Sequence, residues 1–511
     1  MRKFLLAVII SCCFHFAFCQ TPEDALRSSW FIPNGTARSM SIGGAVGALG
    51  GDISSVYTNP AGIGMYKTSE AVVSPGMLFN SNQSDYRGTS LNGIKRSGFQ
   101  LGTSGVVIGG KPETPNNSSA FSIAVTQVAS YNNHIQYEGL NNYSSYSEQY
   151  LEELVRDNAD LNAAANNYPF GSSLAFFTYL VDSLADPDGN LIGYRSLVPV
   201  PTGTKQQYDE TDKGGLYEIS FAYGANFSDK LYIGGGLNIP LSFYTQDINY
   251  TETDATEVIN NNFSYSRFTQ HHSIDGAGFN AKIGAIYRPT PSVRLGFAFH
   301  TPSFLYLSDD LSAEMTTDTE DYAGSKTAKS SDFPNAVSHA HYTQLTPYRL
   351  IGSLVYILNQ VEDVKKQKGF VSADIEFANH RGSRYWATYQ GEDIPQSVDD
   401  YYRAIDDVIK SYYQGAVNFR LGGELKFSPI AIRLGGAYYS SPYADHSLKA
   451  SRAMLGGGLG YRDRGMFVDL TFVETFNTDV SFPYRLADKA NTFAELKNQR
   501  ANVLLTFGIK F

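Results

Sequence analysis

Apolar and polar residues alternate one by one along many segments of this chain, and this period of two constrains the fold more than any other feature. The final segment, 503–511, alternates in this way and ends on Phe511. The same pattern runs through 217–227, 231–241 and 417–427. Because successive side chains of a strand point to opposite faces, each segment predicts a β-strand with one apolar face.

The composition indicates which medium these apolar faces meet. Aromatic residues make up 14% of the chain and charged residues only 18%, against about 25% charged residues in typical soluble domains. After the first twenty positions no apolar run reaches the roughly 18 residues of a membrane-spanning helix, which excludes a helical membrane protein. We therefore predict an all-β fold, a transmembrane antiparallel β-barrel whose apolar faces meet lipid. The alternative for any single segment is a strand of a soluble β-domain.

The first residues form a targeting segment. Two basic residues precede an apolar run at 4–18, and the sequence Ala-Phe-Cys before Gln20 fits a small-x-small cleavage site. We predict that residues 1–19 are a signal peptide, and the alternative is a lipoprotein signal with Cys12 as the modified residue. All three cysteines lie in this segment. The exported chain therefore has no cysteine, which suits a bacterial envelope protein.

The barrel is predicted to occupy residues 70–511 with about fourteen strands, an even number as in bacterial single-chain barrels. Short turns such as 228–229 follow the even-numbered strands, and long connections such as 138–214 mostly follow the odd-numbered ones. This alternation is typical of barrels with short turns on one side of the membrane and long loops on the other. Small helices are expected in two of the long loops, near 147–155 and 397–409. The predicted strands are 70–80, 99–110, 119–137, 215–227, 230–251, 263–289, 293–307, 346–360, 368–386, 413–427, 429–442, 450–463, 465–478 and 498–511.

A segment rich in small residues precedes the predicted barrel. Glycines are closely spaced in 37–52, and the run Asn59-Pro60-Ala61-Gly62 follows. Proline disfavours helical conformation in the residue before it, so Asn59 is predicted to be extended. A phosphate-binding loop is improbable because no strand precedes the glycines and no Lys-Ser or Lys-Thr pair follows them. Small residues at this spacing suit a backbone that is packed tightly in a confined space.

This segment resembles the N-terminal hatch of the outer-membrane transporters of long-chain fatty acids and aromatic hydrocarbons, the FadL/TodX type. The resemblance continues in the predicted strands and spans nearly the whole exported chain, although the long loop 138–214 matches nothing in that family. The matching residues are Ala37, Arg38, Met40, Gly43, Gly44, Ala45, Asp52, Val56, Tyr57 and 59–62 in the hatch, and 278–289, 293–302, 346–350 and Phe511 in the barrel.

The resemblance implies both a fold and a function. The fold is a fourteen-stranded barrel plugged by the N-terminal segment, here residues 20–69, with Asn59, Pro60 and Ala61 as the hatch motif. Such transporters capture hydrophobic molecules at the outer surface, pass them to an internal pocket and release them sideways through a gap at a kinked third strand. The terminal Phe511 resembles the signal read by the barrel-assembly machinery. The protein is expected to act as a monomer in outer-membrane lipid.

The third predicted strand contains a break in its pattern. Apolar residues alternate along 121–125, but Gln127 stands where the next apolar residue is due, and Val128 follows it. A slip of this kind predicts a β-bulge at Thr126, Gln127 and Val128. These residues are the candidate for the lateral opening that the resemblance implies. The alternative is an ordinary bulge near the rim of the barrel.

Inward apolar residues indicate a lumen suited to a hydrophobic ligand. In the strand predicted at 346–360 both faces are apolar, although only one of them faces lipid. An apolar lining with few polar groups is typical of sites for hydrophobic ligands. The alternative is that these residues pack against the hatch. The candidate lining residues are Ile351, Val355, Ile357, Met454 and Leu504.

No motif in the chain supports catalysis or a cofactor. His339 and His341 share one face, as metal or haem ligands would, but they lie in a predicted loop without a third ligand or a thiolate. No Gly-x-Ser-x-Gly elbow occurs. The net charge is −10 without a cluster of basic residues, so no nucleic-acid partner is expected.

The sequence therefore predicts a passive transporter in the outer membrane of a Gram-negative-type bacterium, without enzymatic activity or cofactor. Its expected ligands are hydrophobic small molecules such as long-chain fatty acids or aromatic hydrocarbons. Three alternatives stay open: a receptor for haem or another planar ligand, an adhesive or structural barrel whose long loops bind polymers, and a barrel hydrolase.

Overall fold

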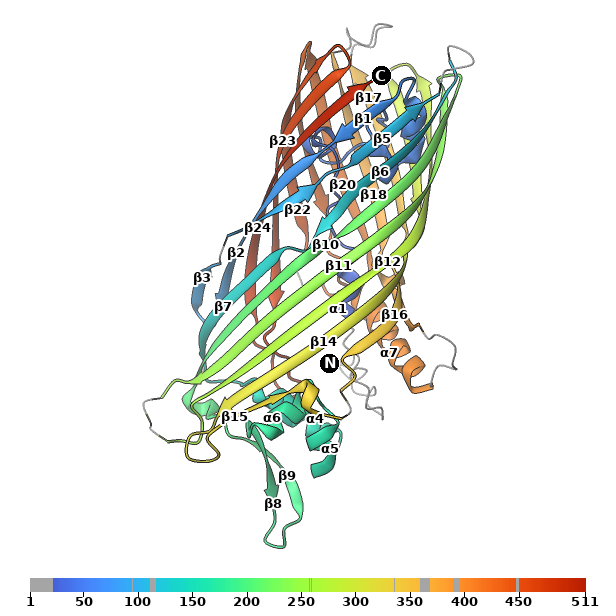
Figure 1. The fold of residues 1–511 in the computed structure, drawn as a ribbon. Coiled ribbons are helices and arrows are strands. Elements are labelled where there is room, and N and C mark those ends of the chain that lie inside the picture. Colours follow the sequence, from blue (N-terminus) through green and yellow to red (C-terminus); the bar gives the residue numbers. More distant parts are fainter. Residues whose placement is uncertain are drawn as a thin grey trace.

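A computed structural model describes residues 22–93, 95–110, 116–256, 258, 260–334, 336–358, 368–388, 396–446 and 450–511. The predicted signal peptide, residues 1–19, lies outside the described residues. One large antiparallel sheet closes on itself, with helices inside the barrel and near one of its ends (Figure 1). None of the helices in these ranges is long and apolar enough to cross a membrane.

The wall of the barrel has fourteen barrel strands, so the fourteen-stranded barrel predicted from the sequence is confirmed. The last barrel strand pairs with the first and closes the sheet, through register pairs such as Val73 with Phe507 and Gly76 with Leu504. In chain order the barrel strands are β1 (Glu70–Val73) with β2 (Pro75–Tyr86); β3 (Thr89–Asn92) with β4 (Arg96–Leu101) and β5 (Ser104–Gly109); β6 (Ser118–Ser130) with β7 (Asn133–Asn141); β10 (Thr204–Phe227); β11 (Leu231–Asp254); β12 (Tyr265–Thr290); β13 (Val293–His300) with β14 (Phe304–Asp318); β16 (His339–Leu345) with β17 (Arg349–Leu358); β18 (Gly369–Asn379) with β19 (Arg384–Ala387); β20 (Gly415–Phe427); β21 (Ile430–Tyr439); β22 (Arg452–Asp463); β23 (Met466–Ser481); and β24 (Ala494–Lys510).

Several strands run well beyond their predicted bounds. β10 begins at Thr204 rather than near position 215, and β14 ends at Asp318 rather than near position 307. In the added part of β10 an exposed side chain such as Lys205 is polar, whereas farther along the same strand Phe221 is exposed. The alternation of apolar and polar residues is lost where the outer face meets water, so the sequence pattern does not reveal this part of the strand.

The outer wall carries a belt of exposed apolar side chains. Its members lie on the outward faces of strands around the barrel, alternating with residues that point into the lumen. A barrel that spans a membrane presents such a belt to lipid. Members of the belt include Met77, Phe99, Ile108, Phe121, Tyr223, Ile233, Leu237, Ile283, Phe297, Leu354, Ile375, Leu421, Leu434, Leu459, Leu470 and Phe507.

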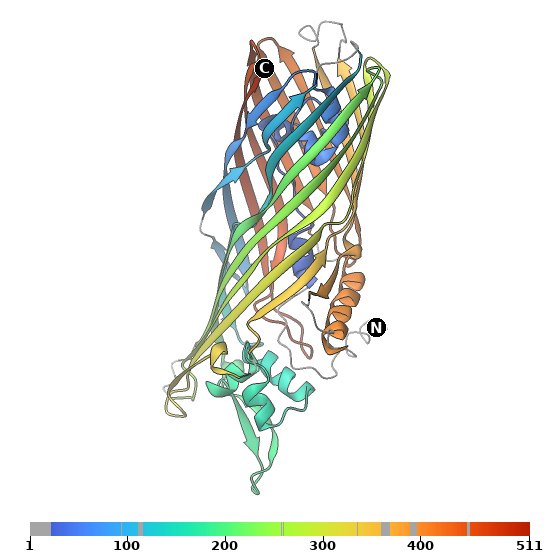
Figure 2. The ribbon, with the colours of Figure 1, turned by 45° about the vertical axis from the view of Figure 1, so that its right-hand side comes forward.

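The N-terminal part of the described chain fills the lumen, and residues 22–66 are named the hatch below. Figure 2 shows this segment in blue inside the wall. Nearly all of its residues are buried or half-buried. Three of the buried apolar clusters join the hatch to the inner face of the barrel, and a further cluster packs the long loop with α4 (Ser147–Arg156) and α6 (Ser172–Phe177) against the ends of the strands. The hatch contains α1 (Pro22–Arg27), α2 (Ala37–Ser41), α3 (Ser55–Thr58) and the three-ten helix η2 (Pro60–Met65).

Small helices lie at the end of the barrel that carries the long loops (Figure 1). The helices expected near 147–155 and 397–409 are present as α4 (Ser147–Arg156) and α7 (Gln396–Tyr412). α7 packs against β19 beside the barrel. The other elements of this end and its loops are α5 (Leu161–Asn166), α6 (Ser172–Phe177), the hairpin of β8 (Val181–Ala185) and β9 (Leu191–Ser196), β15 (Ser325–Lys329), and the three-ten helices η3 (Val200–Thr202), η4 (Ser330–Asp332) and η6 (His380–Gly382).

Candidate functional site

Asn59 of the predicted hatch motif joins the hatch to the wall. Its Nδ2 donates to the backbone oxygen of Gly47 in the hatch at 2.6 Å, and to those of Ala285 on β12 and Phe297 on β13 at 3.4 and 3.3 Å. Its Oδ1 accepts the N–H of Ala61 at 3.1 Å and so caps η2. The residue is extended, with φ −151° and ψ 102°, as expected before proline. The side chain of Asn59 thus joins the Gly47 and Ala61 segments of the hatch to β12 and β13.

Three glycines form a row on the inner wall beneath this motif. Gly224, Gly234 and Gly284 are neighbours in register on β10, β11 and β12. A Cβ atom on Gly234 would lie 2.4 Å from the backbone of Pro60, and one on Gly284 would lie 2.0 Å from Oδ1 of Asn59. Because contacts this short are not tolerated, any larger residue would push the hatch backbone away from the wall.

A second row of glycines faces the other side of the hatch. Gly422, Gly435 and Gly456 are neighbours in register on β20, β21 and β22. A Cβ atom on Gly435 would lie 2.2 Å from the carbonyl carbon of Ile42, and one on Gly456 would lie 2.6 Å from the carbonyl oxygen of Met40. The two rows together are named the hatch seat. They let the backbone of the hatch lie directly on the backbone of the wall.

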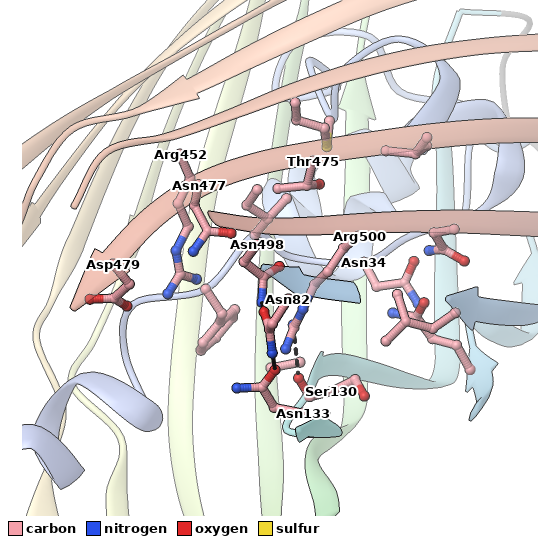
Figure 3. Close-up of a pocket in the computed structure, with 18 of the residues that line it drawn as sticks. Asn34, Asn82, Ser130, Asn133, Arg452, Thr475, Asn477, Asp479, Asn498 and Arg500 are labelled. Carbon is pink, nitrogen blue, oxygen red and sulfur yellow. Dashed lines mark hydrogen bonds between the residues drawn. The ribbon is translucent and has the colours of Figure 1, made fainter. Parts of the chain in front are cut away.

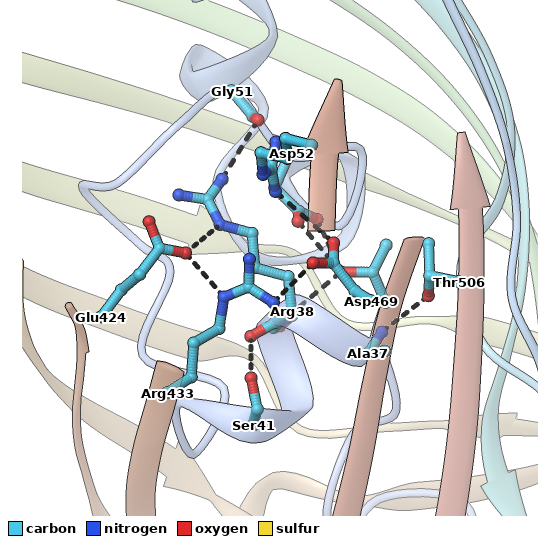
Figure 4. A network of polar contacts seen from close by, with 12 residues as sticks. Ala37, Arg38, Ser41, Gly51, Asp52, Glu424, Arg433, Asp469 and Thr506 are labelled. Carbon is cyan, nitrogen blue, oxygen red and sulfur yellow. Dashed lines mark hydrogen bonds and ion pairs between the residues drawn. The ribbon is translucent and has the colours of Figure 1, made fainter. Parts of the chain in front are cut away.

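A buried network of charges also ties the hatch to the wall (Figure 4). Nε of Arg38 in α2 lies 3.2 Å from Oε2 of Glu424, and Nη1 donates to the carbonyl of Gly51 at 3.4 Å. Arg433 bridges Glu424 and Asp469 at 2.6 Å each. Burial tends to lower the pKa of Arg38, but the neighbouring Glu424 carboxylate raises it above its ordinary value. The hatch residue is therefore charged and paired. Sequence analysis missed the network because its partners lie 386 positions apart.

The five candidate lining residues all point inward, but they do not surround one apolar pocket. Val355, Ile357 and Leu504 are packed in buried clusters with hatch side chains. Ile351 and Met454 line a pocket of about 20 Å³ between the hatch and the wall, and Met454 also lines a larger cavity. Met454 belongs to the same cluster as Leu504, so four of the five candidates pack against the hatch, which is the alternative considered from the sequence.

The larger cavity, of about 190 Å³, lies between the start of the hatch and the wall (Figure 3). Phe31, Ile32 and Asn34 of the hatch line one part of it. The wall contributes apolar and polar side chains from both ends of the barrel sequence. Sequence analysis did not foresee this polar character. The polar wall residues include Asn82, Asn133, Asn477, Asn498, Arg452 and Arg500.

The wall is interrupted beside this cavity. β4 pairs with β2 along one edge, and along its other edge the described strands supply no ladder partner. Along that edge, side chains and not a neighbouring strand form hydrogen bonds with the backbone of β4. Oε1 of Gln127 accepts the N–H of Leu101 at 3.1 Å, and Nδ2 of Asn34 donates to the carbonyl of Leu101 at 3.3 Å. The hatch therefore closes part of the interruption from inside.

The residues of the bulge predicted from the sequence lie at this interruption. Thr126 and Gln127 pair with β10, the register then shifts, and Ala129 pairs next, so Val128 has no partner residue on β10. The carbonyl of Val128 accepts the backbone N–H of Asn34 at 3.4 Å instead. The irregularity of the third barrel strand is thus in direct contact with the segment of the hatch between α1 and α2.

Two other features singled out in the sequence lie apart from the cavity. Phe511 follows β24, its backbone pairs with that of Ser69, and its side chain is exposed. His339 and His341 lie on β16 and not in a loop as predicted, since β16 pairs with β14 there. Their Nε2 atoms are 3.0 Å apart. Within the described ranges no group of three His, Cys, Asp or Glu residues could hold a metal ion.

The chain has the same fold as solved structures of the FadL/TodX type. A Pseudomonas aeruginosa FadL homologue matches with a TM-score of 0.54 and 12% identity, over 94% of this chain and 99% of that chain. The toluene transporter TodX of P. putida matches with a TM-score of 0.52 and 11% identity, over 94% and 99%. No protein-family model matches the chain, and no curated protein matches it in sequence. At these identities the likeness establishes the fold, which is the one that the sequence resemblance implied.

Proposed function

We propose that this protein is an outer-membrane channel through which small, largely apolar molecules pass without input of energy. The interruption of the wall beside the internal cavity carries the proposal. A molecule in the cavity lies next to β4 and the bulge at Val128, where side chains and not a strand ladder close the wall. Sideways exit into lipid spares an apolar molecule the unfavourable transfer into water.

The surroundings of the cavity support this route. Asn34 of the hatch holds both edges of the interruption, through Leu101 on one side and Val128 on the other. A small displacement of this one residue would release both contacts, whereas the hatch seat and the Asn59 contacts would remain. Entry and exit therefore need no unfolding of the plug.

The outer surface supports a place in a membrane. The belt of exposed apolar side chains suits lipid, and short turns with long opposite loops are typical of bacterial outer-membrane barrels. Phe511 lies exposed at the end of the last strand, where the barrel-assembly machinery could read it. Pairing of β24 with β1 and β2 closes the sheet within one chain, which favours a monomer because the first and last barrel strands leave no edge for a second copy.

The names of the similar structures favour an apolar cargo. One is described as a FadL homologue and another as a toluene transporter. Both are transport proteins and not enzymes, in keeping with a chain in which we expect no catalytic chemistry.

A disulfide across the interruption tests the proposal. A Cβ atom on Gly98 of β4 would lie 2.8 Å from Nδ2 of Asn132, which stands between β6 and β7. We expect the double variant Gly98→Cys/Asn132→Cys, when oxidised, to take up labelled toluene and oleate more slowly than the wild type, and reduction to restore uptake. The single-cysteine variants are the matched controls, since the exported chain is expected to contain no other cysteine. Uptake that is unaffected by oxidation of the double variant would rule out lateral exit at this place.

A further inference from the structure

We propose that the cavity selects a compact ring that carries hydroxyl groups and a carboxylate, in preference to a bare hydrocarbon. The inference rests on the proposed channel and its cavity, but it changes the expected cargo, because such an acid is more polar than the largely apolar molecules proposed above. Unpaired oxygen atoms, unpaired positive charge and the size of the cavity carry it (Figure 3).

Three residues that line the cavity have a buried side-chain oxygen atom without a hydrogen-bond donor. Asn34, Gln100 and Asn502 line it and are more than nine-tenths buried. In each of them the side-chain oxygen accepts no hydrogen bond. Buried acceptors are rarely left unpaired, because they have lost water without gaining a donor. A ligand with hydroxyl groups supplies the missing donors, and a hydrocarbon has none to give.

Two guanidinium groups, those of Arg452 and Arg500, lie at the cavity. Arg452 lies 3.6 Å above the ring of Trp30 and donates to its carbonyl at 3.1 Å, while its Nε is unpaired. Arg500 donates to two backbone carbonyls of the third barrel strand at 3.3 Å each. Within the described residues neither guanidinium forms an ion pair. Asp479 is the one carboxylate among the lining residues, which leaves an excess of one positive charge for an anionic ligand.

The size of the cavity sets the size of the ligand. An apolar protein cavity of about 150 Å³ holds one benzene molecule. The cavity here is about 190 Å³, which is enough for one six-membered ring with a few substituents. Phe31, Ile32, Leu78 and Val473 supply apolar surface for the faces of the ring. Aromatic hydroxy acids and sugar acids share this chemistry, so the experiment has to distinguish them.

Calorimetric titration of the full-length protein in detergent tests the inference. The probes are 3,4-dihydroxybenzoate, glucuronate, benzoate, catechol and toluene. We expect one of the two hydroxylated acids to bind at least about tenfold more tightly than toluene, since charge-assisted hydrogen bonds are the strong ones. Benzoate and catechol, which each lack one kind of group, should bind less tightly than 3,4-dihydroxybenzoate. Tighter binding of glucuronate would identify the ligand as a sugar acid. Tighter binding of 3,4-dihydroxybenzoate would identify it as an aromatic hydroxy acid.

A matched pair of variants locates the site. Arg452→Gln should weaken binding of the hydroxylated acid about tenfold or more and leave catechol binding unchanged, since catechol has no carboxylate. Lys497→Gln, an exposed residue on the outer face of β24, is the control and should change neither. In a Trp386→Phe background Trp30 is the remaining tryptophan of the chain. Its fluorescence should respond to the acid, because Arg452 lies on its ring.

The outcomes separate this inference from the proposed function. Toluene binding as tight as that of both acids, or an Arg452→Gln variant with unchanged affinity for the acid, would overturn the inference while the channel could still carry hydrocarbons. If labelled toluene and oleate do not cross the membrane through the protein, and if none of the probes binds, the proposed function itself is wrong. Far-UV circular dichroism of each variant shows whether the barrel has folded.

Discussion

Replacement of Gly435 by alanine should displace the hatch from its seat. The added Cβ would lie 2.2 Å from the carbonyl carbon of Ile42, 2.5 Å from its Cα and 2.6 Å from the nitrogen of Gly43. All three are backbone atoms, which cannot rotate away as a side chain does. Overpacking of this kind costs about 1–3 kcal/mol. Since a tenfold change in an equilibrium corresponds to about 1.4 kcal/mol, the fraction of barrels with a displaced hatch should rise about 5- to 150-fold.

Single-barrel conductance in planar lipid bilayers measures this fraction. The variant should open more often, or for longer, than the wild type. Gly457→Ala is the matched control: it makes the same substitution on the next strand, but its Cβ would meet nothing nearer than 3.9 Å. It is in register with the exposed Leu434 and therefore faces outward. Equal open probabilities for Gly435→Ala, Gly457→Ala and the wild type would refute the idea that the glycine seat holds the hatch.

Three further changes test the contacts of Asn59, the buried network of charges and the bulge at Val128. Asn59→Ala leaves the carbonyl of Gly47 without its donor at 2.6 Å and should lower the free energy of unfolding in urea by about 1–3 kcal/mol. An unchanged midpoint of urea unfolding would contradict the role of Asn59 in holding the hatch to the wall. Arg433→Gln removes the guanidinium that bridges two buried carboxylates and should lower the free energy of unfolding by about 3–5 kcal/mol. Arg462→Gln, at the half-buried edge of the network, should lower it by less than about 1 kcal/mol, and equal effects would count against the network. Deletion of Val128 removes the register shift between β6 and β10 and should slow uptake of labelled toluene in folded protein, and undiminished uptake would argue against exit at the bulge.

Local patterns were sufficient to predict the wall. The alternation of apolar and polar residues depends on neighbours two positions apart, so it is visible wherever one face of a strand meets lipid. It predicted the fourteen barrel strands. It failed in the extensions, where β10 runs back to Thr204, because there the outer face meets water and the apolar signal is lost.

Sequence alone therefore determined the strands of the wall, an extended Asn59 before Pro60 and a pattern break at Val128, since each follows from residues close together in the chain. The tertiary structure decided what those residues meet. The polar cavity exists because the hatch carries Asn34 to a wall where Asn133 and Arg500 converge from opposite ends of the sequence. That meeting depends on closure of the sheet and on the path of the hatch through the lumen, and neither is encoded in a local period.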